Sequence, residues 1–197
     1  MLRTRNYLFA AAAVATALTL SACTGGTSGM DTGGSSRPTN SPTASAESNA
    51  ADVTFAQMMI PHHEQAVAMS ENILAKDGID QRIVDLATQI KAAQDPAIQQ
   101  LRTSLAAWGA EASMSGMDNG TDGMMSDDDM SALQDASGAN AGRLFLEQMI
   151  VHHEGAIVMA QAELDSGENA DALALAEAIV TAQTDEIRVM KGLLGTL

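Results

Sequence analysis

The residues with the greatest capacity for chemistry are the four histidines, which form two His-His-Glu triplets at residues 62–64 and 152–154. Methionines precede or follow both triplets at spacings of three, four and seven residues, which place side chains on one face of a helix. Imidazole with thioether suits a soft d¹⁰ ion such as Cu(I) or Ag(I), whereas imidazole alone also suits Cu(II), Zn(II) or Ni(II). The candidate metal ligands are His62, His63, Met59, Met69, His152, His153, Met149 and Met159, with Met58 as a secondary candidate.

The two triplets belong to an internal repeat. Residues 55–70 match residues 145–160 at eight of sixteen positions, and residues 86–101 match residues 175–190 at six of sixteen. Such a repeat predicts a helical hairpin used twice. If the two helices that carry the triplets face each other across the molecule, two imidazoles and several thioethers converge.

Other interpretations of these side chains remain open. Methionine on an apolar helix face also serves as ordinary core packing, and the histidine pairs could satisfy hydrogen bonds within a polar seam. Adjacent residues on a helix point about 100° apart, so we expect one histidine of each pair to face the interior and the other to lie at its edge. In this alternative the protein is a non-metal interaction module of the cell envelope whose histidines are structural.

Four further polar residues recur near the triplets in both repeats. Glu64 and Glu154 project about 100° further round the helix and are either solvated or hydrogen-bonded to an imidazole that they orient. Gln94 and Gln183 lie near the edge of the apolar faces of their helices. A partly buried amide needs hydrogen-bond partners, and an imidazole N–H is a candidate.

Methionines also occur in the polar segment between the repeats. Met114, Met117, Met124, Met125 and Met130 lie there among Gly, Ser and Asp residues. Exposed thioethers on a loose loop would form a low-affinity collecting arm for Cu(I), with Asp127, Asp128 and Asp129 as a set of ligands for a harder ion. The alternative is a tolerant, variable loop without a metal.

The elements that must position these residues are helices. The chain is 46% hydrophobic but has few aromatic residues, a composition that disfavours sheet-rich folds. Apolar periodicity and turn residues predict helices over roughly residues 52–76, 79–108, 128–136, 140–165 and 169–194. Pro96 should kink the second helix or mark a local break. The fold class is all-α, an antiparallel four-helix bundle built from two hairpins.

Composition and motifs also exclude several functions. The net charge of −15 leaves no basic surface for nucleic acid or for acidic lipid headgroups. A His-Glu-x-x-His zinc motif is absent because Val67 and Ile157 hold the positions of the second histidine, and Glu-x-x-His pairs are absent as well. No nucleotide-binding loop or nucleophile triad can be assembled. We therefore expect a protein that is not an enzyme and has no organic cofactor.

The N-terminus is typical of an exported lipoprotein. A basic start and an apolar stretch predict a signal peptide over residues 1–22, and the segment from Leu20 to Cys23 resembles a bacterial lipobox. We therefore expect a lipid on Cys23 to anchor the chain to a membrane. Because Cys23 is the only cysteine, we expect no disulfide within the chain. Residues 23–51, rich in Gly, Ser, Thr and Pro, predict a flexible tether. The folded domain covers residues 52–197, with repeats at 52–108 and 128–197 and a Met/Asp-rich loop at 109–127.

The doubled Met-Ile-x-His-His-Glu motif, with the closing segment Gln183-Thr-Asp-Glu-Ile-Arg-Val-Met190, resembles the CopM-like family, domain-of-unknown-function family 305. The resemblance covers roughly residues 52–197. It implies a ferritin-like four-helix bundle that is exported and, in the characterised members, binds copper or silver and contributes to copper resistance. The match departs at Gln148, where the first repeat has Met58, which leaves open whether the two half-sites are equal in affinity.

These observations favour a lipid-anchored, extracytoplasmic protein that sequesters copper or hands it on. Cu(I) is the favoured ion, with Ag(I) as a second soft ion, and the role would be metal tolerance. The expected partners are metal ions and, through Cys23, a membrane. The sequence leaves open whether the chain forms homo-oligomers and whether it stores or delivers its metal.

Overall fold

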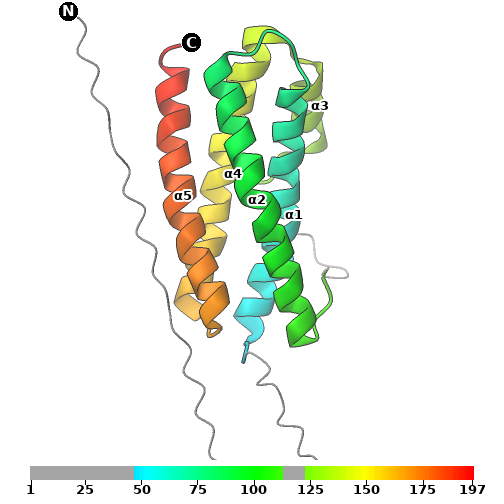
Figure 1. The fold of residues 1–197 in the computed structure, drawn as a ribbon, viewed down its shortest axis with the longest axis vertical. Helices are drawn as coiled ribbons and strands as arrows, with labels where there is room; N and C mark the ends of the chain where they lie inside the picture. The colour runs from blue at the N-terminus through cyan, green and yellow to red at the C-terminus, as the bar shows by residue number, and fades with distance from the viewer. Residues whose placement is uncertain (1–46, 113–122) are drawn as a thin grey trace, which may run out of the picture. The chain divides into compact units, whose positions relative to one another are not determined.

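The computed structural model describes residues 47–112 and 123–197, and within these ranges every regular element is a helix (Figure 1). The helices are α1 (Ala50–Leu74), α2 (Gln81–Trp108), α3 (Asp127–Asp135), α4 (Gly138–Ser166) and α5 (Ala170–Leu194). In the bundle α1 pairs with α2 and α4 pairs with α5, and the two hairpins join mainly through α1 and α4. The short helix α3 lies against α4 and α1. The predicted all-α four-helix bundle is confirmed.

Local sequence explains where the helices begin and end. Asn49 caps α1 by accepting hydrogen bonds from the backbone N–H groups of Ala51 and Asp52, and the Asp52 carboxylate accepts in return from the Asn49 N–H. Ser126 and Asp129 form the same reciprocal box at α3. Gly109 ends α2 at a positive φ of 70°, a conformation that glycine adopts without a Cβ penalty.

Of the two outcomes expected at Pro96, a kink or a local break, the break does not occur, because α2 runs as one helix from Gln81 to Trp108. Proline removes one N–H donor from the helix and so leaves one carbonyl, that of Ala92, without its usual partner. Both Ala92 and Pro96 lie on the exposed face of α2, where solvent can take the place of the lost donor. The helix therefore tolerates the proline.

The bundle interior contains two apolar clusters. The first cluster adjoins the α1–α2 turn and α3, and its largest members include Met69, Ile73, Leu86, Leu133, Phe145, Met149 and Met190. The second cluster lies toward the start of α1, and its largest members include Phe55, Met59, Ile98, Leu101, Leu105 and Met159. Each of the four long helices contributes to both clusters, which is the packing expected of an amphipathic bundle.

Residues 1–46 lie outside the described residues. They include the predicted signal peptide, Cys23 and most of the predicted tether. None of the helices within residues 47–112 and 123–197 is long and apolar enough to cross a bilayer.

The three inter-repeat methionines that the structure describes are less exposed than the sequence predicted. Met114 and Met117 lie outside the described residues, but Met124 is half-buried, and Met125 and Met130 pack against the first cluster. Gln65 of α1 fixes the backbone of Met125, since its side chain donates to the Met125 carbonyl at 2.9 Å and accepts from the Met125 N–H at 2.7 Å. Packing on the bundle thus gives Met125 and Met130 a structural role that the polar context of the loop concealed.

Candidate metal centre

A layer of buried polar side chains crosses the bundle between its two apolar clusters. In each long helix the polar residues lie between the residues that belong to one cluster and those that belong to the other. We call this set the polar layer; its members are His62 and His63 of α1, Gln94 of α2, His152 and His153 of α4, and Gln183 and Glu186 of α5. The first six side chains are buried and Glu186 is partly buried. A buried polar layer needs internal partners or a ligand, because uncompensated polar groups destabilise a core.

The two histidine pairs meet across the α1–α4 interface. The ring centroids of His62 and His152 are 3.7 Å apart with an interplanar angle of 40°, and those of His152 and His153 are 6.4 Å apart. The structure therefore brings together His62 and His152, one imidazole from each repeat, as expected if the two helices face each other.

The expectation that one histidine of each pair lies at an edge is wrong. None of the four is more than 2% exposed. The physical reason is that α1 and α4 each have neighbours on two sides, α1 between α2 and α4, and α4 between α1 and α5. The two histidine side chains of each pair point about 100° apart, and on these helices both directions lead into an interface with a neighbouring helix.

Burial keeps at least two of the imidazoles uncharged near neutral pH. It lowers the pKa of His63 to about 3, and the nearby His62 and His153 add to the effect. It also lowers the pKa of His152 well below its ordinary value, with the neighbouring imidazoles adding to the effect. A neutral imidazole retains a lone pair, and this is the form that binds metal ions.

Glu186 orients the His153 ring. Its Oε2 lies 2.7 Å from His153 Nε2, and because a carboxylate only accepts, Nε2 is the donor of this hydrogen bond. Among the described residues, Nδ1 of His153 has no hydrogen-bond partner, and neither does Nδ1 of His63. Two buried ring nitrogens thus have unused hydrogen-bonding capacity.

Sequence reasoning missed Glu186. Its signal is weak, because the repeat places Ala97 at the equivalent position (186 − 89 = 97). The available clue was its spacing of three residues from Gln183 on α5, which puts both side chains on one helix face.

The two glutamines lie in the polar layer, as their recurrence suggested. Gln94 and Gln183 are each 4% exposed, and within the described part of the chain the Oε1 atom of each is buried without a hydrogen-bond partner. Both line a cavity of about 150 Å³ together with His63 and Glu186. The two amides therefore border the imidazoles but retain unused acceptor capacity.

The structure places Glu64 and Glu154 away from the imidazoles. Both side chains are about half exposed, and they form ion pairs with Arg102 and, at 3.2 Å, with Lys191. Arg102 and Lys191 occupy equivalent positions of the repeat, so each hairpin carries the same surface ion pair. Of the two interpretations of these glutamates, the solvated one agrees with the geometry.

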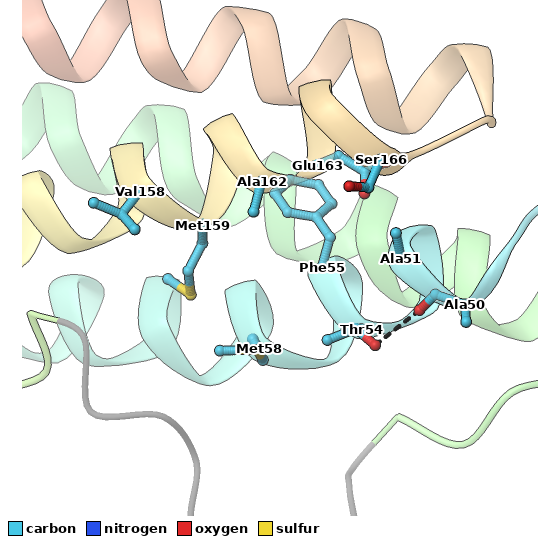
Figure 2. A pocket seen from close by; sticks show the side chains of 10 residues that line it. All are labelled: Ala50, Ala51, Thr54, Phe55, Met58, Val158, Met159, Ala162, Glu163 and Ser166. Atoms are coloured by element: carbon cyan, nitrogen blue, oxygen red, sulfur yellow. Dashed lines mark hydrogen bonds between the residues drawn. The ribbon is translucent and has the colours of Figure 1, made fainter.

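The candidate thioethers lie on both sides of the polar layer. Met59 and Met149 stand one helical turn from the histidines, and both are fully buried, Met59 in the second cluster and Met149 in the first. Met69 and Met159 lie two turns away and are also in the core. Met58 is only half-buried; Figure 2 shows it on α1 facing Met159 of α4, at a cavity of about 430 Å³.

The described residues contain no group of three or more His, Cys, Asp or Glu side chains arranged to hold a metal ion. Besides the imidazoles, the polar layer offers the amide oxygens of Gln94 and Gln183, and the thioethers of Met59 and Met149 lie one helical turn away in the apolar clusters. Two imidazoles with adjacent thioethers fit the low coordination numbers and soft ligands that Cu(I) and Ag(I) accept.

Comparison with known proteins identifies the family of the chain. The model of the family described as "Domain of unknown function (DUF305)" matches residues 52–194. The chain belongs to this family. The DUF305 fragment from Deinococcus radiodurans is 31% identical, with a TM-score of 0.70, and the match covers 76% of this chain and 99% of that one.

Further solved structures agree in fold. A DUF305 protein from Streptomyces coelicolor, named as a secreted protein, is 30% identical with a TM-score of 0.70, over 74% of this chain and 91% of that one. CopM in its Cu(I)-bound form is 28% identical with a TM-score of 0.63, over 74% of this chain and 96% of that one. CopM has also been solved bound to Cu(II) and to Ag. No curated protein sequence matches the chain.

Proposed function

We propose that this DUF305 protein binds a soft metal ion, copper in the Cu(I) state above all and silver as its analogue, outside the cytoplasm. The observation that carries the proposal is the contact between His62 and His152, whose ring centroids lie 3.7 Å apart in the bundle interior. The family supports it, because the similar protein CopM is known in Cu(I)-, Cu(II)- and Ag-bound forms.

The chain's own residues would perform three tasks. His62 and His152 offer nitrogen ligands from opposite helices, and Met59 and Met149 offer thioethers one turn away. The two apolar clusters exclude bulk water on either side of the polar layer, which favours soft ligands over water for the ion. Glu186 orients His153 through Nε2, the kind of contact that commonly supports a metal ligand.

The proposed role is reversible binding without turnover, so that the protein sequesters metal or passes it on and adds to metal tolerance. Anchoring through a lipid on Cys23 would keep this capacity at the membrane. Metal analysis of the protein from an envelope fraction should find copper, and globomycin-sensitive processing at Cys23 would test the anchor.

The binding test uses the mature chain titrated with Cu(I) against a chelator of known affinity. The wild type should bind more tightly than about micromolar. Removing residues that merely orient a metal ligand costs about 10–100-fold in affinity, so His62→Ala with His152→Ala should cost at least about 100-fold. Glu64→Gln with Glu154→Gln is the matched control, because it changes the same helices on their exposed face. Unchanged binding in the histidine variant would refute the proposal.

The competing function is a non-metal interaction module. The observation in its favour is the His153–Glu186 hydrogen bond, which shows one imidazole already satisfying a structural role. It predicts that replacing all four histidines lowers thermal stability by the same amount with and without metal. A metal-dependent difference would exclude it.

A further inference from the structure

The cavity of about 150 Å³ between α2 and α5 connects the outside of the bundle to the polar layer. Its rim is made by small residues that are exposed, Ala93 on α2 and Ala178 and Ala182 on α5. Its floor is made by buried polar groups, His63, Gln94 and Gln183. In Figure 1, α2 and α5 form one face of the bundle, with α4 behind them.

The chemistry of the floor indicates what the cavity would accept. Oε1 of Gln94 and Oε1 of Gln183 are buried acceptors without a donor among the described residues, and the Glu186 carboxylate lies beside them. No lysine or arginine lines the cavity. A ligand that fits must supply hydrogen-bond donors and positive charge, which a cation with bound water does. A volume of this size has room for several water molecules.

The cavity exists because the repeat is not symmetric. Glu186 of α5 fills its position beside His153, whereas the equivalent position beside His63 carries Ala97, which lines the cavity. A methyl group in place of a carboxylate leaves room next to His63. The second cavity, of about 430 Å³, differs in kind: Phe55, Met58, Val158 and Met159 line it, and no imidazole does.

We propose that the α2–α5 cavity is the entrance to the polar layer and receives a partly hydrated cation, with the waters donating to Gln94 and Gln183 and with Glu186 supplying the attracting charge. The ion would leave its waters there and pass to the imidazoles through His63. This inference rests on the proposed metal-binding function. It adds the path by which the ion enters the polar layer, which lies on the His63 side and has no equivalent beside His153. The acidic chain, with a net charge of −15, raises the local concentration of cations at the mouth.

The test measures how fast Cu(I) transfers from a coloured chelator to the full mature protein, by stopped-flow absorbance, alongside equilibrium affinity. Ala97→Leu fills the cavity from α2, and Ala182→Leu narrows the rim from an exposed position and so remains informative if the first variant folds poorly. Ala162→Leu is the matched control, because it fills the other cavity. Circular dichroism establishes that each variant is folded.

Association rates vary by about one to three orders of magnitude among variants of one binding site, so we expect Ala97→Leu and Ala182→Leu to slow transfer about tenfold or more, with equilibrium affinity within about threefold of the wild type. Glu186→Gln should slow transfer and reduce its dependence on ionic strength. Ala162→Leu should transfer at the wild-type rate.

Two outcomes would refute the proposed entrance while leaving metal binding intact. One is transfer at the wild-type rate in both Ala97→Leu and Ala182→Leu, and the other is slower transfer only in Ala162→Leu. A wild-type protein that takes no Cu(I) from the chelator would refute the proposed function as well. The wild-type titration therefore separates the two failures.

Discussion

His63 and His153 hold equivalent positions of the repeat but meet different neighbours. His153 donates to Glu186, whereas the matching position beside His63 is Ala97 and the imidazole borders a cavity. One residue difference thus separates an imidazole that is oriented by a carboxylate from one that borders a cavity. The same layer contains the histidine contact on which the proposed copper site depends.

At this scale the thioethers provide a sharp prediction. Met59→Leu with Met149→Leu preserves apolar volume at two fully buried positions, and such swaps usually cost less than about 1.5 kcal/mol each in stability. If the thioethers bind the ion, Ag(I) affinity should fall by about tenfold or more, which is about 1.4 kcal/mol. Met190→Leu, at a buried position on α5, is the control and should leave the affinity unchanged. Calorimetric titration with Ag(I) measures the affinity of the wild type and of each variant. If the Met59→Leu, Met149→Leu variant binds Ag(I) as tightly as the wild type, these methionines serve packing alone.

At the scale of elements, a pair of carboxyl groups joins the start of α1 to the end of α4. Asp52 is fully buried and accepts from the backbone N–H groups of Asn49, Glu168 and Asn169. Glu163 is 1% exposed; burial raises its pKa to about 8, and the nearby Asp52 carboxylate adds to the rise. At neutral pH Glu163 is therefore mostly protonated.

This pair predicts a loss of stability in mild alkali. A carboxyl group whose pKa rises on folding stabilises the protein while it is protonated, and the stability falls as the pH increases toward and through the folded pKa. For Glu163, with a pKa of about 8, the expected loss between pH 7 and pH 9 is about 1 kcal/mol. The titrations of His63 and His152 lie below this window, since burial lowers both pKa values.

Glu163→Gln should remove that loss, because an amide does not titrate. Urea unfolding at pH 7 and pH 9 measures the free energy of unfolding for both proteins. An equal decline in the wild type and the variant would show that Glu163 is not the responsible group.

The segment that leads into α3 gives a second prediction about elements. Gly123 has a φ of 77°, and a Cβ there would lie 2.7 Å from the Val151 carbonyl oxygen and 2.8 Å from Gly155 Cα. Gly109 has a similar φ of 70° but open space around it. Backbone strain alone costs about 1–2 kcal/mol, so Gly109→Ala isolates that cost. Gly123→Ala should lower the free energy of unfolding by at least about 1 kcal/mol more, from the added backbone clash; equal costs would contradict the close approach.

At the scale of the whole molecule, the polar layer ties together helices from both repeats. His62 comes from the first hairpin and His152 from the second, so an ion held between them would link the two halves of the bundle. Binding to the native state alone raises its stability by mass action. A metal ion bound at the proposed site would therefore stabilise the entire fold.

The coupling predicts a metal-dependent melting temperature. At an Ag(I) concentration about 100 times Kd, the gain is about 2.7 kcal/mol, which corresponds to an increase of about 5–10 °C for a domain of this size. Scanning calorimetry with and without Ag(I) measures the increase. His62→Ala with His152→Ala should abolish it, and a persistent increase in that variant would place the ion elsewhere.

The sequence by itself determined the helices, the repeat and the family. Apolar periodicity and turn residues act over a few residues, so the predicted helix bounds agree with the structure to within a few positions. The repeated His-His-Glu motif predicted that His62 and His152 face each other, because equivalent positions of a pseudo-twofold bundle approach the same axis.

Only the tertiary structure decided which faces of each helix are buried against neighbouring helices. It buried both histidines of each pair, because α1 and α4 have neighbours on two sides, and it made Met125 a packing residue by docking α3 on the bundle. It also brought Glu186 of α5 to His153 of α4, a contact that the repeat does not encode. Local sequence fixes the angle between side chains on one helix, whereas the surroundings of each side chain depend on the packing of helices that are distant in the chain.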